Sequence, residues 1–300
     1  MNASTHLLEK VSRAVVGVHS SVPAEHASTI VGLGTDRRAS GTLVDSDGLI
    51  LTVNYALMGA QNVIVTLAGG EQLPAAVVAQ DYGSGLGLIR IDTKDCPFLK
   101  TSSSESVSVG QEVFVVSSVG NEGRCADSGI ITFLGQFDAL WEFTLDRCIM
   151  TSAMNSGLGG GALCNSRGEL IGVSYLSMPD IARSGLAVPI ELFADHRDEL
   201  LAHGRRTTAP ARIWIGLLSY TLREHVVIAG VMPGGPGDKA GLKPGDVVLS
   251  VDGHEVNERR ALYDALCAHK PGEQIQIKVF RNNQVHDFAV PGITIEDYFG

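Results

Sequence analysis

Short apolar runs, each bounded by turn residues, follow one another through most of the first 190 residues. Two of them flank Asp47-Gly48 in SGTLVDSDGLILTV, and two more flank Gly69-Gly70 in NVIVTLAGGEQLPAAVVAQD. A further pair, in GALCNSRGELIGVSYL, turns at residues 165–168. Strands at this spacing, with almost no helix between them, are typical of an all-β barrel or sandwich. The pattern therefore predicts a mainly β fold.

The pattern changes near residue 204. The segment 189–204, PIELFADHRDELLAHG, is expected to form a helix that stops at its terminal glycine. RRTTAP, at 205–210, has the charged and proline-terminated composition of a linker. A length of 300 residues also favours two domains. We predict a first domain over 1–204, a linker over 205–210 and a second domain over 211–300.

The second domain shows strands, a loop rich in glycine and proline, and one helix. The loop is PGGPGDKAGLKPGD, and the helical stretch is NERRALYDALCAHKPG. Leu262 and Leu266 fall on one face of that helix by their spacing of four. The charged face around Glu258, Arg259 and Arg260 is expected to be solvated.

Charge and cysteine usage exclude several classes of function. The formal net charge is −10; residues 206–300 hold 10 Lys and Arg against 11 Asp and Glu, so residues 1–205 carry −9. Such an acidic body would repel nucleic acid and anionic membranes. The five cysteines include no C-x-x-C spacing, which argues against a zinc site and favours free thiols, with a Cys125–Cys148 pair left open. No cofactor or metal is expected.

The first 22 residues have neither the layout of a signal peptide nor a long apolar run. No other stretch reaches transmembrane length either. As written, the chain is expected to be soluble, although a leader removed earlier would leave no trace in it.

A glycine-rich turn, AMNSGLGGGALCN at 153–165, needs a separate explanation. So much glycine lets a backbone approach another group closely. A phosphate loop would lead into a helix and end in G-K-[ST], whereas strand and hairpin signals follow here. Two readings stay open: a purely structural tight turn, or a remnant of a peptide-binding cleft.

Several motifs, in order, resemble the HtrA/DegP family over about residues 8–290. They are LLEKVSRAVVGV, ASGTLVDSDGLILT, VTLAGGEQLPAAVVAQD, NSGLGGGALCNSRGELIGV and, in the second domain, AGLKPGDVVLSVDGHEV. The resemblance implies a trypsin-like double β-barrel followed by a PDZ domain. It also implies serine endopeptidase activity and a place outside the cytoplasm. Family members often trimerise through aromatic N-terminal contacts, but residues 1–30 contain no Phe, Tyr or Trp.

The family's catalytic triad is missing at all three matching positions. The histidine position in LTVNYAL is Tyr55, the aspartate position in DYGSGLGLIRI is Gly85, and the serine position is Gly159. The resemblance still implies an oxyanion-loop remnant at Gly157, Leu158 and Gly159. Glycine cannot act as a nucleophile, and tyrosine, with an ordinary pKa near 10, is a poor base at neutral pH. This predicts a pseudoprotease.

A serine endopeptidase with a relocated centre is the competing hypothesis. Ser152 and Ser156 flank the glycine turn, and Lys94 and Lys100 are the lysines that a Ser–Lys arrangement would need. No histidine lies between His26 and His196, so the predicted barrels lack the usual base. Surface or packing serines are the simpler interpretation.

The second domain offers the better binding site. PDZ domains bind an extended peptide as an added strand and hold its terminal carboxylate on backbone N–H groups. The resemblance places this site at seven residues: Trp214, Ile215, Gly216, Leu217, Ser219, Leu262 and Leu266. The alternative is that Trp214 and Ile215 simply pack in the core.

The partners expected of such a site are peptides or protein C-termini with an apolar last residue, and unfolded protein segments. An active paralogue that this chain regulates is a third possibility. Neither nucleic acid nor a membrane span is expected.

Overall fold

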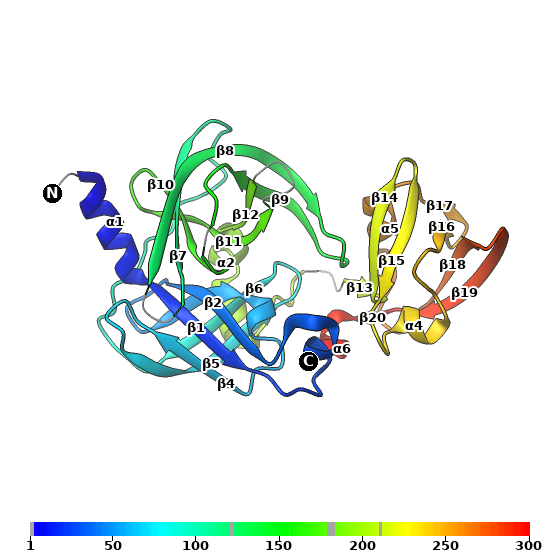
Figure 1. Cartoon of the computed structure of the whole chain (residues 1–300), viewed down its shortest axis with the longest axis horizontal. Helices are drawn as coiled ribbons and strands as arrows, with labels where there is room; N and C mark the ends of the chain where they lie inside the picture. The colour runs from blue at the N-terminus through cyan, green and yellow to red at the C-terminus, as the bar shows by residue number, and fades with distance from the viewer. Residues whose placement is uncertain (1–2, 121–122, 156, 179–183, 210–211) are drawn as a thin grey trace. The chain divides into compact units, whose positions relative to one another are not determined.

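The computed structural model describes residues 3–120, 123–155, 157–178, 184–209 and 212–300. The chain folds as two compact units (Figure 1). The first unit contains Met1–Thr29, Leu33–Gln136 and Leu145–Thr207. The second contains Ile30–Gly32, Phe137–Thr144 and Thr208–Gly300. Residues 137–144 therefore belong to the second unit, whereas the sequence analysis assigned all of 1–204 to the first domain.

The first unit consists of two closed β-barrels, as the trypsin-like fold requires (Figure 1). The first barrel has the strand order β1-β2-β3-β6-β5-β4, with bounds β1 Val15–Ser21, β2 Asp36–Leu43, β3 Leu49–Val53, β4 Asn62–Thr66, β5 Gln72–Asp81 and β6 Leu86–Ile91. The second has the order β10-β11-β12-β9-β8-β7, with bounds β7 Glu112–Ser118, β8 Arg124–Asp138, β9 Thr144–Thr151, β10 Ala162–Asn165, β11 Leu170–Met178 and β12 Ser184–Pro189.

The predicted hairpins form because their turns satisfy the backbone while their apolar runs fill the barrels. At the first of them, the Asp45 carboxylate accepts the N–H groups of Asp47 and Leu49 at 3.0 and 2.9 Å. Strand β3 follows and is buried along its whole length. Each barrel thus has its own apolar interior, represented by Leu51 in the first and Ile149 in the second, both fully buried.

Helices are few in the first unit. Helix α1, Ala3–Ala14, leads directly into β1. The single helix expected over 189–204 is instead two short ones, α2 Glu191–Ala194 and α3 Arg197–His203. Gly204 ends α3 in the left-handed conformation, with φ of 71°. Two irregular turns, η1 Thr29–Leu33 and η2 Asn54–Ala56, complete the described elements before residue 208.

The second unit is a PDZ fold built on one sheet of order β14-β15-β16-β18-β19, so β14 is an edge strand. Its elements are β13 Ile213–Trp214, β14 Leu217–Leu222, β15 His225–Val231, α4 Pro236–Ala240, β16 Val247–Val251, β17 His254–Glu255, α5 Arg259–Cys267, β18 Gln274–Arg281, β19 Gln284–Pro291, β20 Ile293–Thr294 and α6 Ile295–Phe299. Alternate residues of β18, namely Ile275, Ile277 and Val279, are fully buried and face the core.

All five cysteines are free thiols, including Cys125 and Cys148. Within the ranges that the structure describes, no helix combines the length and apolar character needed to cross a bilayer.

Candidate functional site

The three positions that match the catalytic triad lie together in the first unit. Tyr55 comes from η2, Gly85 from the turn between β5 and β6, and Gly159 from the glycine-rich turn before β10. Tyr175 of β11 joins them. Its carbonyl oxygen lies 3.3 Å from the Tyr55 hydroxyl, and the two rings meet edge to face with centroids 5.6 Å apart.

The two tyrosines fill the space where triad side chains would stand. A Cβ atom added to Gly159 would lie only 2.1 Å from the Tyr55 hydroxyl oxygen. A Cβ added to Gly85 would lie 2.7 Å from the Tyr175 ring, and Gly85 also has φ of +75°. Neither glycine can therefore be given a side chain unless a tyrosine moves.

The tyrosines are poor acid–base groups at neutral pH. Burial raises the pKa of Tyr55 to about 12. Burial also raises the pKa of Tyr175, and the neighbouring Tyr55 adds to the shift. Each ring therefore keeps its proton and cannot serve as a general base near pH 7.

The N–H groups of the glycine-rich turn mostly point into the protein. Those of Gly157, Leu158 and Gly160 donate to Asn155 Oδ1, the Ser118 carbonyl and the Ser174 carbonyl at 3.0, 3.0 and 2.7 Å. The close packing of this turn explains its glycines in structural terms. The oxyanion-loop remnant at Gly157, Leu158 and Gly159 stays a prediction, with two of its N–H groups already engaged.

Serines outside the triad positions show structural contacts. Ser152 Oγ accepts the N–H of Ile130 at 3.0 Å, and Ser156 lies outside the described residues. Lys94 and Lys100 are exposed. A serine–histidine hydrogen bond does occur between Ser28 and His26, at 2.7 Å.

Ser28 is nevertheless fully buried, which keeps a substrate away from its hydroxyl. The hydroxyl donates to the Met58 carbonyl at 3.0 Å and accepts from Arg37 at 2.6 Å. These contacts hold the loop before β2 and provide no reactive site. Within the described ranges, His, Cys, Asp and Glu nowhere gather in threes as metal ligands do.

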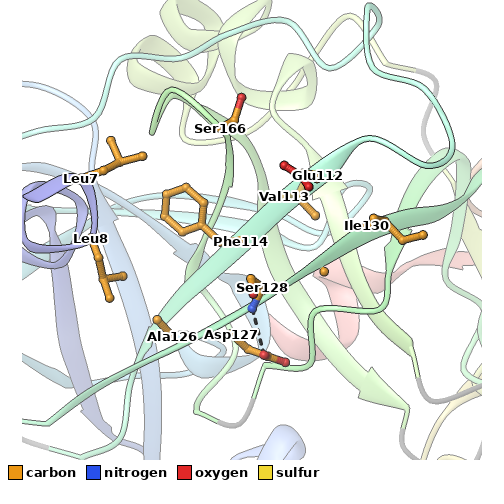
Figure 2. Close-up of a pocket in the computed structure, with 11 residues that line it drawn as sticks. Leu7, Leu8, Glu112, Val113, Phe114, Ala126, Asp127, Ser128, Ile130 and Ser166 are labelled. Carbon is orange, nitrogen blue, oxygen red and sulfur yellow. Dashed lines mark hydrogen bonds between the residues drawn. The ribbon is translucent and has the colours of Figure 1, made fainter. Parts of the chain in front are cut away.

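A hollow of about 710 Å³ opens elsewhere in the first unit, between α1 and the β7–β8 pair. Figure 2 shows Leu7 and Leu8 of α1 on one side of it and Phe114 of β7 beside them. Neither Tyr55 nor Gly159 lines this hollow. Its walls are mainly apolar, and Glu112, Asp127, Ser128 and Ser166 add polar side chains to them.

The predicted carboxylate loop of the second unit does hold a carboxylate. The N–H groups of Ile215 and Leu217 donate to the two oxygens of Glu142, at 2.9 and 2.6 Å. Gly216 between them has φ of 81°, which favours glycine and turns successive N–H groups toward one point. Burial raises the pKa of Glu142 to about 7, against the opposing effect of the loop N–H groups.

The side chains of the same loop pack in the interior, as the alternative reading proposed. Ile215 is fully buried, and Trp214 is 3% exposed. The Trp214 ring contacts Tyr298 and Phe299 of α6, with centroids 4.7 and 5.9 Å apart. The loop thus uses its side chains for packing and its backbone for binding.

The edge strand β14 and helix α5 both contact the segment 138–142. Ser219 N donates to the Leu140 carbonyl at 2.8 Å, as a strand neighbour would. Leu262 and Leu266 of α5 are buried in the core of the second unit. The contacts from α5 to residues 138–142 come from Tyr263 and Arg259 instead.

Arg259 corrects one prediction, because it is not a solvated surface charge. It forms an ion pair with Asp138 and donates to the Asp138 carbonyl at 2.6 Å. The sequence analysis missed Asp138, Glu142, Tyr175 and Tyr263 altogether. The hint at Glu142 in the sequence is an acidic residue inside the largely apolar run DALWEF.

Family comparisons match both units. The family described as a trypsin-like peptidase domain matches residues 39–173, and the PDZ domain family matches residues 210–291. A probable periplasmic serine endoprotease, DegP-like, from Hahella chejuensis is 31% identical over 267 residues. That match covers 84% of this chain and 56% of the relative, so the chain spans little more than half of the relative's length.

Two further relatives match over most of both chains. The serine endoprotease DegS from Haemophilus influenzae is 27% identical, covering 96% of this chain and 85% of its own length. The solved structure of the HtrA-type protease AlgW with tripeptide is 25% identical, with a TM-score of 0.60 and 97% of each chain covered.

Proposed function

Because this chain belongs to the HtrA family of trypsin-like peptidases with a PDZ domain, we propose that it has kept the family's peptide binding and lost its proteolysis. In this proposal the first unit is a pseudoprotease. The second unit binds protein segments that end in a free carboxylate. Unfolded chains with such an end, or the C-terminus of a folded partner, are the ligands that this chemistry fits.

One observation carries the loss of proteolysis: the Tyr55 hydroxyl lies 2.1 Å from where a side chain on Gly159 would begin. Acyl transfer needs a nucleophile and a base within hydrogen-bond reach of each other. A packed tyrosine pair stands at this place instead. Removing a complete triad lowers turnover by about 10⁶ and leaves roughly 10³–10⁴ over water. This remaining activity is too small to sustain proteolysis.

The binding half of the proposal is supported by backbone geometry. The loop at 215–217 already places two N–H groups on one carboxylate, and β14 beside it is the edge strand of its sheet. A peptide added to that edge gains main-chain hydrogen bonds as a further strand. The related AlgW was solved with a tripeptide, which supports peptide binding in general.

The test combines a cleavage assay with active-site labelling of the full chain. Unfolded casein and a fluorophosphonate probe are each incubated with the protein, with and without a carboxyl-terminal peptide that could activate a latent protease. We expect neither cleavage nor labelling in any mixture. Labelling of one serine, abolished when that serine is changed to alanine, would overturn the proposal in favour of a relocated endopeptidase centre.

Regulation of an active paralogue is a role that the same binding site would allow. Co-purification from the native host separates this role from solitary peptide binding. A protein recovered without any HtrA-type partner would count against it.

A further inference from the structure

We propose that residues 138–142 are an internal ligand of the peptide groove, with the side chain of Glu142 in the place of a peptide's terminal carboxylate. The inference rests on the proposed function of this groove and adds how its access is controlled. An incoming carboxyl-terminal segment must displace the chain's own hairpin tip before it can bind.

The Glu142 carboxylate occupies the donors of the loop at 215–217. Both Glu142 oxygens accept loop N–H groups, so the carboxylate saturates the donors that a peptide end would need. Glu142 has φ of 57°, a left-handed conformation that turns the chain away after the side chain has entered the loop. The Ala139 N–H then reaches the Phe143 carbonyl at 2.8 Å and closes the tip as a hairpin.

The backbone of the tip also pairs with the edge strand β14. The Leu140 carbonyl, two residues before Glu142, accepts the Ser219 N–H at 2.8 Å on the free edge of β14. A bound peptide would make this kind of bond two residues before its own carboxylate, since successive strand residues face opposite directions. The tip therefore occupies both the carboxylate loop and the strand position of the groove.

Helix α5 contacts the tip through Tyr263 and Arg259. The Tyr263 hydroxyl accepts the Glu142 N–H at 3.1 Å and donates to the Ala139 carbonyl at 2.8 Å. Arg259 grips Asp138 through its carboxylate and its carbonyl oxygen. Contacts from Asp138, Ala139, Leu140 and Glu142 mark this segment as seated against β14 and α5 and not merely adjacent to them.

Several ionisable groups surround Glu142. Arg259, Tyr263 and Cys267 belong to α5, while Arg212 precedes β13 and interacts electrostatically with Cys267. Glu142 and Arg259 oppose each other in their effect on the pKa of Tyr263, which burial raises.

The internal ligand lowers the affinity for external peptides by mass action. A tethered segment competes at a high effective concentration and loses no translational freedom on docking. The apparent affinity for a peptide equals the affinity of the open groove multiplied by the fraction of molecules whose tip is released. Peptide binding in turn frees residues 139–143, the connection between β8 and β9.

The experiment measures peptide affinity by fluorescence anisotropy on the full chain. The probe is a fluorescein-labelled peptide with the sequence of residues 136–142 carrying Glu142→Val, so that it ends in a free carboxylate. A carboxamide version of the probe is the ligand control. Glu142→Ala is the test variant, and Glu224→Ala, at an exposed glutamate in the turn after β14, is the matched control.

We expect Glu142→Ala to bind the carboxylate probe about 10- to 100-fold more tightly than wild type, since it removes a charge-assisted contact of the closed state. Glu224→Ala should match wild type, and the carboxamide should bind weakly to every protein. Equal affinities for wild type and Glu142→Ala would overturn the internal ligand and leave the groove's function intact. No binding to either protein would overturn the proposed function itself.

Hydrogen exchange of the peptide-free proteins distinguishes local release of the tip from misfolding of the variant. The N–H groups of Leu217 and Ser219 should exchange faster in Glu142→Ala, while those of the core strand β18 stay protected. The isosteric Glu142→Gln gives a second, smaller perturbation of the same contact. Unchanged exchange at Leu217 and Ser219 would count against the internal ligand.

Discussion

A substitution at Gly159, the position that matches the family's serine, tests whether the Tyr55 hydroxyl fills the space of a side chain there. In Gly159→Ala, the new Cβ would stand 2.1 Å from the Tyr55 hydroxyl, far inside the ordinary contact distance. The backbone of Gly159 is not left-handed, so an alanine is strained there by space alone. Overpacking of this kind costs about 1–3 kcal/mol, against about 0.4–1 kcal/mol gained from the stiffer unfolded chain.

The clash disappears when the hydroxyl is removed. In Tyr55→Phe the new Cβ keeps two close neighbours, the Tyr175 carbonyl oxygen at 3.1 Å and a Tyr55 ring atom at 3.3 Å, which a shift of a few tenths of an ångström accommodates. Losing the 3.3 Å hydrogen bond to the Tyr175 carbonyl costs at most about 1 kcal/mol. We therefore expect Gly159→Ala to destabilise wild type by about 1–2 kcal/mol and to be nearly neutral in Tyr55→Phe, a coupling of similar size.

Urea unfolding of the four proteins, followed by far-ultraviolet circular dichroism, measures this coupling. Tryptophan fluorescence would report the wrong part of the chain, because Trp141 and Trp214 both belong to the second unit. Gly69→Ala is the control, since a Cβ at Gly69 meets no atom within 4 Å. Equal costs of Gly159→Ala in both backgrounds would refute the idea that the Tyr55 hydroxyl fills the nucleophile's space.

Three further predictions concern charge. The docked Glu142 has a pKa raised to about 7 from 4.5, so docking takes up a proton and weakens as the pH rises through this window; because the peptide's own carboxylate enters the same loop, the effect is isolated in the ratio of wild-type to Glu142→Gln peptide affinity, which should rise by up to about two orders of magnitude from pH 4.5 to 8 in anisotropy measurements, and a constant ratio would contradict this. Arg259→Lys keeps the charge but loses the fork on Asp138, so the probe peptide should bind a few-fold more tightly; weaker binding would mean that Arg259 holds the peptide instead. Arg206→Met leaves the buried Asp81 carboxylate without its ion pair and should lower the free energy of unfolding by about 3–5 kcal/mol, as measured by thermal circular dichroism. Adding Asp81→Asn in the double variant should restore part of that loss.

Local patterns in the sequence were sufficient for most of the fold. The hairpin at Asp47-Gly48 and the helix end at Gly204 follow from turn residues whose conformations are set by their immediate neighbours. The break within 189–204 did not follow, because the apolar pattern there continues across Asp195 and His196. Periodicity marks which residues face the core but not where a short helix stops.

The candidate sites show the opposite balance. Tyr175 lies 120 residues from Tyr55, and no pattern near either residue announces that the two rings meet. Glu142 was hidden in the same way, since its partners at 215 and 217 are more than 70 residues away. Long-range pairings of this kind depend on how strands close into barrels and sheets, which composition and periodicity leave undetermined.

Backbone N–H groups are presented to acceptors in both units, but only one of the two sets can exchange its acceptor cheaply. In the glycine-rich turn the acceptors are mainly strand carbonyls, such as those of Ser118 in β7 and Ser174 in β11, and a ligand carboxylate could take the donors only if these buried carbonyls lost their partners. In the PDZ loop the acceptor is one side chain at the tip of a hairpin, Glu142, and a peptide carboxylate can replace it oxygen for oxygen. No donor is left unsatisfied by that replacement, so the net cost is that of ordering the peptide and freeing the tip. We therefore expect a ligand to exchange with the acceptor in the second unit. The glycine-rich turn instead helps to hold the first unit together.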